Sequence, residues 1–305
     1  MNTNNSTLEY VKEDSFKLEK EIQHLCESSL NELLNLEFVK SECSVNQFRI
    51  DTLAYDKETN SFVIIEFKRD KSYSVIDQGY SYLSLLLNNR ADFIVEYNEK
   101  HPLTPLRRDQ VDWGQSRVIF IAPSFTEYQK EAINFKDLPI ELWQINRYSG
   151  NIICFNQITA RQTVSSIKTI QNNETNIISQ VSSQITVYDE ESHLVNKSQF
   201  IIELYQKIKE YILNFGNEIT IRPRKYYIGF IIETTFCDIT IQSNSIKIWL
   251  NNMRYGELND PLALCRDVRS IRHNGNGDYE IRIETEDNLE YIIGLIKQSY
   301  KLSKK

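Results

Sequence analysis

Residues 48–69 read Phe48-Arg-Ile-Asp-Thr-Leu-Ala-Tyr-Asp-Lys-Glu-Thr-Asn-Ser-Phe-Val-Ile-Ile-Glu-Phe-Lys-Arg69, a pattern that predicts two β-strands joined by a polar turn at 56–60. Because side chains alternate between the faces of a strand, Glu66 and Lys68 lie on the same face. Both faces of the second strand are apolar until its end, which is typical of a central strand that is covered on both sides.

An acid and a base thus arrive together at the end of a buried strand, where charges are costly unless they are paired. Asp51 on the first strand would approach Glu66 if the two strands are hairpin neighbours. A divalent metal would pair the two carboxylates, because Mg²⁺ prefers hard oxygen ligands. Lys68 could then contact the attacking water or the charge that develops on phosphorus. The alternative is an ordinary cross-strand Asp–Lys ion pair, since E-x-K patterns are short enough to occur by chance.

The order of five residue types resembles the PD-(D/E)xK nuclease superfamily: Asp51, Glu66-Phe67-Lys68, Gln78 and Tyr82. Gln78-x-x-x-Tyr82 matches the extension found in RecB-like members. The local sequence around these motifs is most similar to the NucS-like branch. The resemblance covers roughly the first half of the chain. Ile50 stands where the family usually has proline, a departure that leaves the chemistry untouched.

The resemblance implies a restriction-endonuclease-like fold and a DNase that depends on Mg²⁺ or Mn²⁺, an endonuclease more than an exonuclease. In such an enzyme Asp51 and Glu66 bind the metal, and Lys68 orients or activates the water. DNA is the implied partner, and repair or defence is the implied setting.

Three further residues are implied to support the site or to bind substrate. Gln78 and Tyr82 are spaced i, i+4 on a helix predicted over 73–88, so they share one face. That face borders the active site in RecB-like nucleases. Arg49 could contact phosphate. Without the E-x-K pattern ten residues earlier, a helix surface pair would be the better interpretation of Gln78 and Tyr82.

An acidic residue on the first helix often joins the metal site in this superfamily. Apolar spacing predicts that helix from a cap at Ser15 to about Leu36. Glu27 lies at the edge of the apolar stripe and is the residue that we match to the family's catalytic and metal-binding acid. Glu21 and Glu32 are alternatives, and an exposed glutamate with no role is an equal expectation.

The remaining pattern predicts an α/β domain, a linker and a smaller α+β domain. In the first half, strands are predicted at 36–45, 117–122, 140–148 and 151–155, and a helix at 124–135, opened by a capping box at Ser124. Residues 92–97 fit either a strand or a helix, and the polar residues that flank them without turn signals favour the helix. This order suits a mixed sheet flanked by helices. The expected domain limits are 1–157 for the nuclease-like domain, 158–195 for a polar linker and 196–305 for the second domain.

The second domain is predicted as a helix at 200–215, antiparallel strands, and a final helix capped by Thr285. It resembles a C-terminal domain of unknown function often found behind NucS-like domains, which implies no chemistry. Residues 222–227, Arg-Pro-Arg-Lys-Tyr-Tyr, mix cations with aromatic rings as nucleic-acid platforms do. A solvated hairpin tip is the better interpretation. A homodimer or a protein partner could form through this domain.

Composition is that of a folded protein with an acidic first half. The 305 residues carry a net charge of −7, and Met1–Gly150 holds 17 Lys+Arg against 24 Asp+Glu, a difference of 17 − 24 = −7. The five scattered cysteines predict reduced thiols in a cytoplasmic protein. No apolar run is long enough to cross a bilayer, so no membrane contact is expected. P-loop, dinucleotide-binding and HExxH motifs are lacking.

The excess of acidic over basic residues favours a second hypothesis from another functional class. Non-specific DNA binders usually have a basic footprint. A nuclease fold without catalysis, serving as a module that binds nucleic acid or a protein, would agree with the charge. The full set of matching residue types favours the enzyme.

Overall fold

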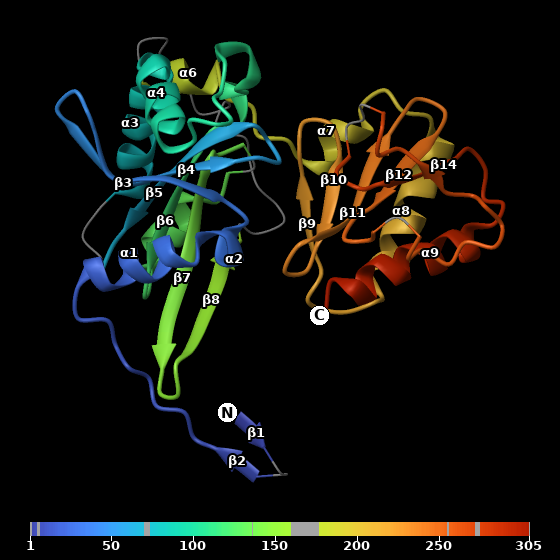
Figure 1. Cartoon of the computed structure of the whole chain (residues 1–305), viewed down its shortest axis with the longest axis horizontal. Coiled ribbons are helices and arrows are strands. Elements are labelled where there is room, and N and C mark those ends of the chain that lie inside the picture. Colours follow the sequence, from blue (N-terminus) through green and yellow to red (C-terminus); the bar gives the residue numbers. More distant parts are fainter. Residues whose placement is uncertain are drawn as a thin grey trace. The chain divides into compact units, whose positions relative to one another are not determined.

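The chain forms two compact units, residues 1–187 and 188–305, in the computed structural model (Figure 1). The structure describes residues 2–4, 7–69, 74–135, 137–159, 177–254, 256–271 and 275–304. The first unit contains a six-stranded mixed sheet flanked by helices, and the second contains a six-stranded antiparallel sheet with helices. This confirms the predicted α/β domain followed by a smaller α+β domain.

The first sheet has the strand order β3-β4-β5-β6-β7-β8. Its strands are β3 (Glu37–Val45), β4 (Phe48–Asp56), β5 (Ser61–Phe67), β6 (Arg117–Ala122), β7 (Ile140–Tyr148) and β8 (Ile152–Ile158). β5 pairs with β4 in antiparallel and with β6 in parallel orientation. The predicted hairpin of residues 48–69 is therefore confirmed, and its second strand lies in the middle of the sheet.

Helices cover both faces of β5, whose residues are all buried. Val63, Ile65 and Phe67 belong to the apolar cluster that includes Ile22 of α1 (Glu19–Ser28). Phe62 and Ile64 belong to a second cluster, formed with α3 (Val75–Asn88) and α4 (Arg90–Lys100). Alternation along one strand thus separates two cores, as expected for a strand that is covered on both sides.

Shorter elements complete the first unit. They are β1 (Asn2–Asn4), β2 (Thr7–Glu9), α2 (Leu30–Leu34), the 3-10 turns η1 (Arg108–Gln110) and η2 (Trp113–Gln115), α5 (Glu127–Ala132) and α6 (Ile177–Ser182). β1 and β2 form a two-stranded sheet. Trp113 of η2 stacks on Phe62 at 5.4 Å between ring centroids, so this aromatic residue packs against the core.

Several predicted boundaries were wrong for local reasons. The single helix predicted from 15 to 36 is divided at Ser29, whose φ of −131° leaves the helical region. The serine before it donates its hydroxyl to a backbone carbonyl, a bond that competes with helix continuation. Thr126, rather than Ser124, forms the capping box of α5. The final helix follows Asn288, at φ 59°, and is not capped by Thr285.

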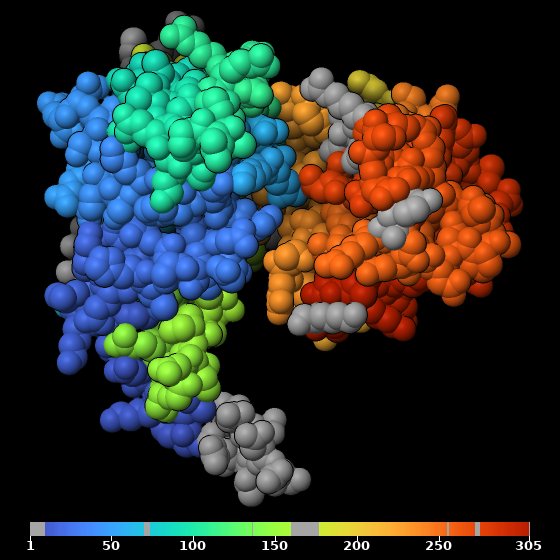
Figure 2. All heavy atoms as spheres, viewed as in Figure 1, coloured from blue at the N-terminus to red at the C-terminus, as the bar shows by residue number. Residues whose placement is uncertain are grey.

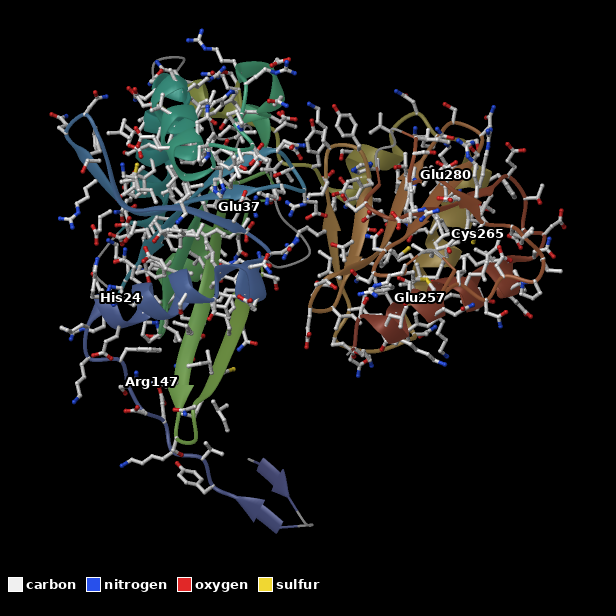
Figure 3. The ribbon with its side chains drawn as sticks, viewed as in Figure 1. His24, Glu37, Arg147, Glu257, Cys265 and Glu280 are labelled. Atoms are coloured by element: carbon white, nitrogen blue, oxygen red, sulfur yellow. The ribbon has the colours of Figure 1, made fainter. Side chains whose placement is uncertain are left out.

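The segment before α1 is fixed to the end of β7 by Arg147 (Figure 3). Its guanidinium lies 3.0 Å from a carboxylate oxygen of Asp14 and 4.7 Å from the ring of Phe16. Asp14 N also donates to the Arg147 carbonyl at 2.8 Å. The tip of the β7–β8 hairpin, residues 148–152, extends beyond α1 in the space-filling view (Figure 2).

The second unit has the strand order β13-β14-β12-β11-β10-β9, antiparallel throughout. Its elements are α7 (Glu190–Leu194), α8 (Gln199–Leu213), β9 (Thr220–Pro223), β10 (Ile228–Ile231), β11 (Thr235–Ile241), β12 (Ile246–Leu250), β13 (Arg266–Asp267), β14 (Tyr279–Ile283) and α9 (Leu289–Leu302). α8 and α9 pack on the apolar face of this sheet. The opposite face carries charged residues, among them Glu280, which pairs with Lys247 at 3.1 Å (Figure 3).

Two predicted segments take a defined form here. Of residues 222–227, Arg222 and Pro223 end strand β9 and residues 224–227 form the turn to β10, where Arg224 N donates to the Tyr227 carbonyl at 2.7 Å, as expected of a hairpin tip. Of the predicted linker, residues 160–176 lie outside the described residues. The part of 158–195 that is described includes α6, which packs on α3 in the first unit, and α7, which belongs to the second.

None of the five cysteines forms a disulfide in the structure. Burial raises the pKa of the Cys26 thiol to about 12 and that of Cys43 to about 11. In the described part of the chain, every helix is too short or too polar to span a lipid bilayer.

The buried ion pairs of Arg117 are the first test of this fold. Arg117 lies 2.9 Å from an oxygen of Asp56 and 2.8 Å from an oxygen of Glu141. Arg117→Met leaves the buried carboxylate of Asp56 without its cation, so we expect the free energy of unfolding to fall by about 3–5 kcal/mol in urea titrations. The matched variant Arg107→Met, whose pair with Asp109 is exposed, should cost less than about 0.5 kcal/mol. Equal effects in the two variants would contradict the buried network.

Candidate active site

Asp51 and Glu66 lie opposite each other where strands β4 and β5 stop pairing. The antiparallel register between the two strands ends at Thr52 and Ile65, one residue before this pair. Beyond that point, Phe67 N donates to Asp51 Oδ2 at 3.0 Å, so a side chain replaces a backbone partner. The carboxylate of Asp51 is thereby directed toward the end of β5 that carries Glu66.

Glu66 is buried, with only 4% of its surface exposed, and its two carboxylate oxygens differ in their hydrogen-bond partners. Lys68 Nζ lies 2.7 Å and Gln78 Nε2 lies 3.0 Å from Oε1. Oε2 is buried and has no hydrogen-bond partner among the described residues. Because an unpartnered buried carboxylate oxygen is costly, its presence indicates a place for a cation or a polar ligand.

Helix α3 positions Gln78 and Tyr82, which are spaced i, i+4, beside Glu66. Ser74 caps the helix by accepting from Asp77 N, which fixes its first turn. Gln78 Nε2 donates to both Glu66 Oε1 and the Tyr82 hydroxyl, the latter at 3.1 Å. Burial and the nearby Glu66 carboxylate raise the pKa of Tyr82 well above its ordinary value, so its hydroxyl remains neutral. The structure thus brings Glu66, Lys68, Gln78 and Tyr82 together.

Burial and the charge of Glu66 raise the pKa of Asp51 from 3.8 to about 6. The hydrogen bond from Phe67 N and the charge of Lys68 act in the opposite direction. Removal of the Asp51 carboxylate from water is the larger cause of the raised pKa, and the like charge of Glu66 adds to it. Such a perturbed acid beside a lysine is characteristic of functional sites.

Glu27 does not meet this pair in the structure. It lies on α1 and accepts hydrogen bonds from Gln23 and from Thr52, the neighbour of Asp51 whose side chain points to the other face of β4. Of the alternatives, Glu21 pairs with Arg147 at 3.5 Å and Glu32 is exposed. In the described ranges, no three His, Cys, Asp or Glu residues are grouped so that they could hold a metal ion. The role of Glu27 therefore stays a prediction.

Arg49 is exposed and pairs with Glu42 of β3, which also pairs with Lys20. Glu42 faces Asp51, because its neighbours Ser41 and Cys43 pair with Thr52 and Ile50. Sequence reasoning missed Glu42 and Gln23. The signal for Gln23 was a polar residue inside the apolar stripe of α1, four positions before Glu27.

The donor set fits a divalent cation that prefers oxygen. Glu66 offers a buried oxygen without a partner, and Asp51 offers a second carboxylate on the adjacent strand. Mg²⁺ or Mn²⁺ commonly takes one or two protein carboxylates and completes its coordination with water and phosphate. The nitrogen and sulfur ligands that Zn²⁺ prefers are not part of this pair.

Comparison with known proteins gives one family model and one full-length relative. Residues 190–303 match a domain of unknown function, DUF5655. An uncharacterized protein of Haemophilus influenzae is 50% identical over 294 residues, which cover 96% of this chain and 96% of that protein.

Solved structures give weaker and partial matches. A complex of EndoMS with double-stranded DNA is 18% identical and covers 39% of this chain and 43% of that chain, with a TM-score of 0.27. A repair endonuclease of Pyrococcus abyssi is 20% identical over 39% and 44% of the two chains, with a TM-score of 0.23. SfsA of Pyrococcus furiosus with Ca²⁺ is 13% identical over 47% and 65%, with a TM-score of 0.25. The chain spans less than half the length of the two endonuclease structures.

The raised pKa of Asp51 predicts how the metal-free protein responds to pH. Between pH 3.8 and about 6 the folded chain retains a proton that the unfolded chain has lost, so stability falls as pH rises through this window. Asp51→Asn removes the cost of ionising this carboxylate in the folded protein. We therefore expect the substitution to raise the free energy of unfolding by roughly 1–2 kcal/mol at pH 7.5 and by less at pH 4. Urea unfolding in EDTA measures this, with exposed Asp109→Asn as the control. A variant less stable than the wild type at pH 7.5 would contradict the assignment.

Proposed function

We propose that this chain, which belongs to the same family as the Haemophilus influenzae protein, is a metal-dependent DNA endonuclease that hydrolyses phosphodiester bonds. The observation that carries the proposal is the buried Oε2 of Glu66, which has no hydrogen-bond partner in the described residues and lies on the strand adjacent to Asp51. Together with Lys68, Gln78 and Tyr82, this pair supports placement in the PD-(D/E)xK superfamily.

In the proposed reaction Asp51 and Glu66 would hold the cation through carboxylate oxygens. Such a Mg²⁺ or Mn²⁺ ion would supply Lewis-acid polarisation of the phosphate and a lowered pKa of the attacking water. Lys68, fixed by its ion pair with Glu66 at 2.7 Å, orients that water and stabilises the charge that develops on the phosphate oxygens. Glu27 is proposed only as an outer participant that acts through Gln23 and Thr52.

Two residues on α3 and one on β4 are proposed to support substrate binding. Gln78 holds Glu66 Oε1 and Tyr82 at once, so it keeps the carboxylate in one rotamer. Arg49 is exposed at the start of β4, two residues before Asp51, and is proposed to contact a phosphate of the DNA after leaving Glu42. Arginine suits this role because its planar fork matches phosphate oxygens.

A second function is favoured by the charge of the chain. The net charge of −7 gives no general basic footprint for DNA. A module that uses the fold to bind nucleic acid or a protein, without catalysis, would agree with it. DNA binding that weakens steeply with salt, without cleavage in Mg²⁺ or Mn²⁺, would favour this second function over the first.

The catalytic assignment predicts the effect of two isosteric substitutions. Glu66→Gln removes the carboxylate charge and Lys68→Met removes the cation, so we expect each to lower the rate of DNA cleavage by about a hundredfold or more. Gel assays of plasmid cleavage in Mn²⁺ measure the rate, and circular dichroism verifies folding. Exposed Glu99→Gln on α4 is the matched control and should cleave at the wild-type rate. Full activity in both site variants would overturn the assignment.

The endonuclease proposal predicts activity on DNA that has no ends. Covalently closed circular plasmid should be converted to nicked and linear forms, because an internal phosphodiester is the proposed target. Linear DNA of the same sequence with blocked ends should be cut at a similar rate. An enzyme that degrades only linear DNA with free ends would be an exonuclease.

A further inference from the structure

Asp51 is the residue of β4 at which regular pairing fails on both sides of the strand. The register with β5 ends at Thr52. The register with β3 passes from Ser41–Thr52 to Cys43–Ile50 and omits Glu42, whose φ of 52° takes its backbone out of the strand conformation. The polar backbone groups of Asp51 therefore need partners from outside the sheet.

Gln23 supplies such a partner. Its side-chain Nε2 donates to the main-chain carbonyl of Asp51 at 2.9 Å. On the side toward β5, the Asp51 carboxylate accepts from Phe67 N at 3.0 Å. Asp51 is thus held at two points, its carbonyl by a side chain from α1 and its carboxylate by the backbone of β5.

Gln23 is itself fixed, because it is 3% exposed and both of its polar atoms are engaged. Nε2 also lies 2.9 Å from Glu27 Oε1 and 3.1 Å from Ser41 Oγ, and Oε1 accepts from Lys20 Nζ at 3.1 Å. A buried amide with all its groups satisfied has little rotational freedom. It transmits the position of α1 directly to the peptide of Asp51.

We infer that Gln23 is a positioning residue that sets the place of the Asp51 carboxylate by holding its main-chain carbonyl, an inference that rests on the proposed metal site. Gln23 does not touch the cation or the DNA. It fixes the peptide of Asp51 in β4 at the point where regular pairing with the neighbouring strands stops. Without the amide, the Asp51 peptide is free to turn and satisfy its carbonyl elsewhere, and its carboxylate leaves the position beside Glu66.

The experiment compares two equally buried glutamines. Gln23→Met preserves side-chain volume and removes the donor. Gln129→Met does the same on α5, where Gln129 is 2% exposed and belongs to the capping box with Thr126. Mn²⁺ is titrated calorimetrically into the wild type and both full-length variants, below the onset of unfolding of the least stable one. We expect the Kd for Mn²⁺ to rise about ten- to a hundredfold in Gln23→Met and to remain within about twofold of wild type in Gln129→Met.

The outcomes separate the two proposals. Wild-type affinity in folded Gln23→Met would overturn the positioning role and leave the proposed nuclease intact. No saturable Mn²⁺ binding in the wild type would overturn the metal site and this inference together. Should Gln23→Met fail to fold, Gln23→Asn retains an amide but shortens the side chain, and it should also weaken Mn²⁺ binding. Unchanged affinity in Gln23→Asn would then overturn the inference.

Discussion

The repulsion between two carboxylates, Asp51 and Glu66, is the constraint on which the arrangement of the first unit depends. Burial of the Asp51 carboxylate and the like charge of Glu66 both make its ionised form unfavourable, and the raised pKa of Asp51 is the result. The chain offsets the repulsion with an ion pair from Lys68 and hydrogen bonds from Gln78 and the backbone of Phe67. A divalent cation would complete the compensation, since it places positive charge at the buried oxygen that has no partner.

The surrounding fold holds these groups with elements that are themselves well fixed. β5 is apolar on both faces, so helices pack on each side of it and neither face is free to shift. α3 reaches the site from one face with Gln78 and Tyr82, and α1 reaches Asp51 from the other with Gln23. Sites built on strands and helices hold their geometry better than sites on loops. The ends of the pairing between strands give the carboxylates room to approach each other.

Ion pairs near the candidate site partly explain why this region of the chain presents no basic surface. Glu42 lies opposite Asp51, between the paired residues Ser41 and Cys43, and it engages both Lys20 and Arg49, so two cations near the site are neutralised in the free protein. A phosphate backbone would compete with one carboxylate for these cations. The proposed DNA contact therefore relies on the exchange of ion-pair partners and not on a permanently exposed basic surface. Its affinity should be sensitive to salt.

The sequence alone determined the mixed sheet, the central strand and the proximity of five site residues, because alternation, helical spacing and hairpin turns are local properties of the chain. Asp51 faces Glu66 for the reason that adjacent strands of a hairpin must align, and Gln78 contacts Tyr82 because four residues make one helical turn. Only the tertiary structure decided which acid of the first helix lies where. Glu27 is turned toward Thr52, and Gln23 donates to the carbonyl of Asp51, because α1 packs against β4 and β5. Such contacts depend on packing between distant segments, which no local pattern encodes.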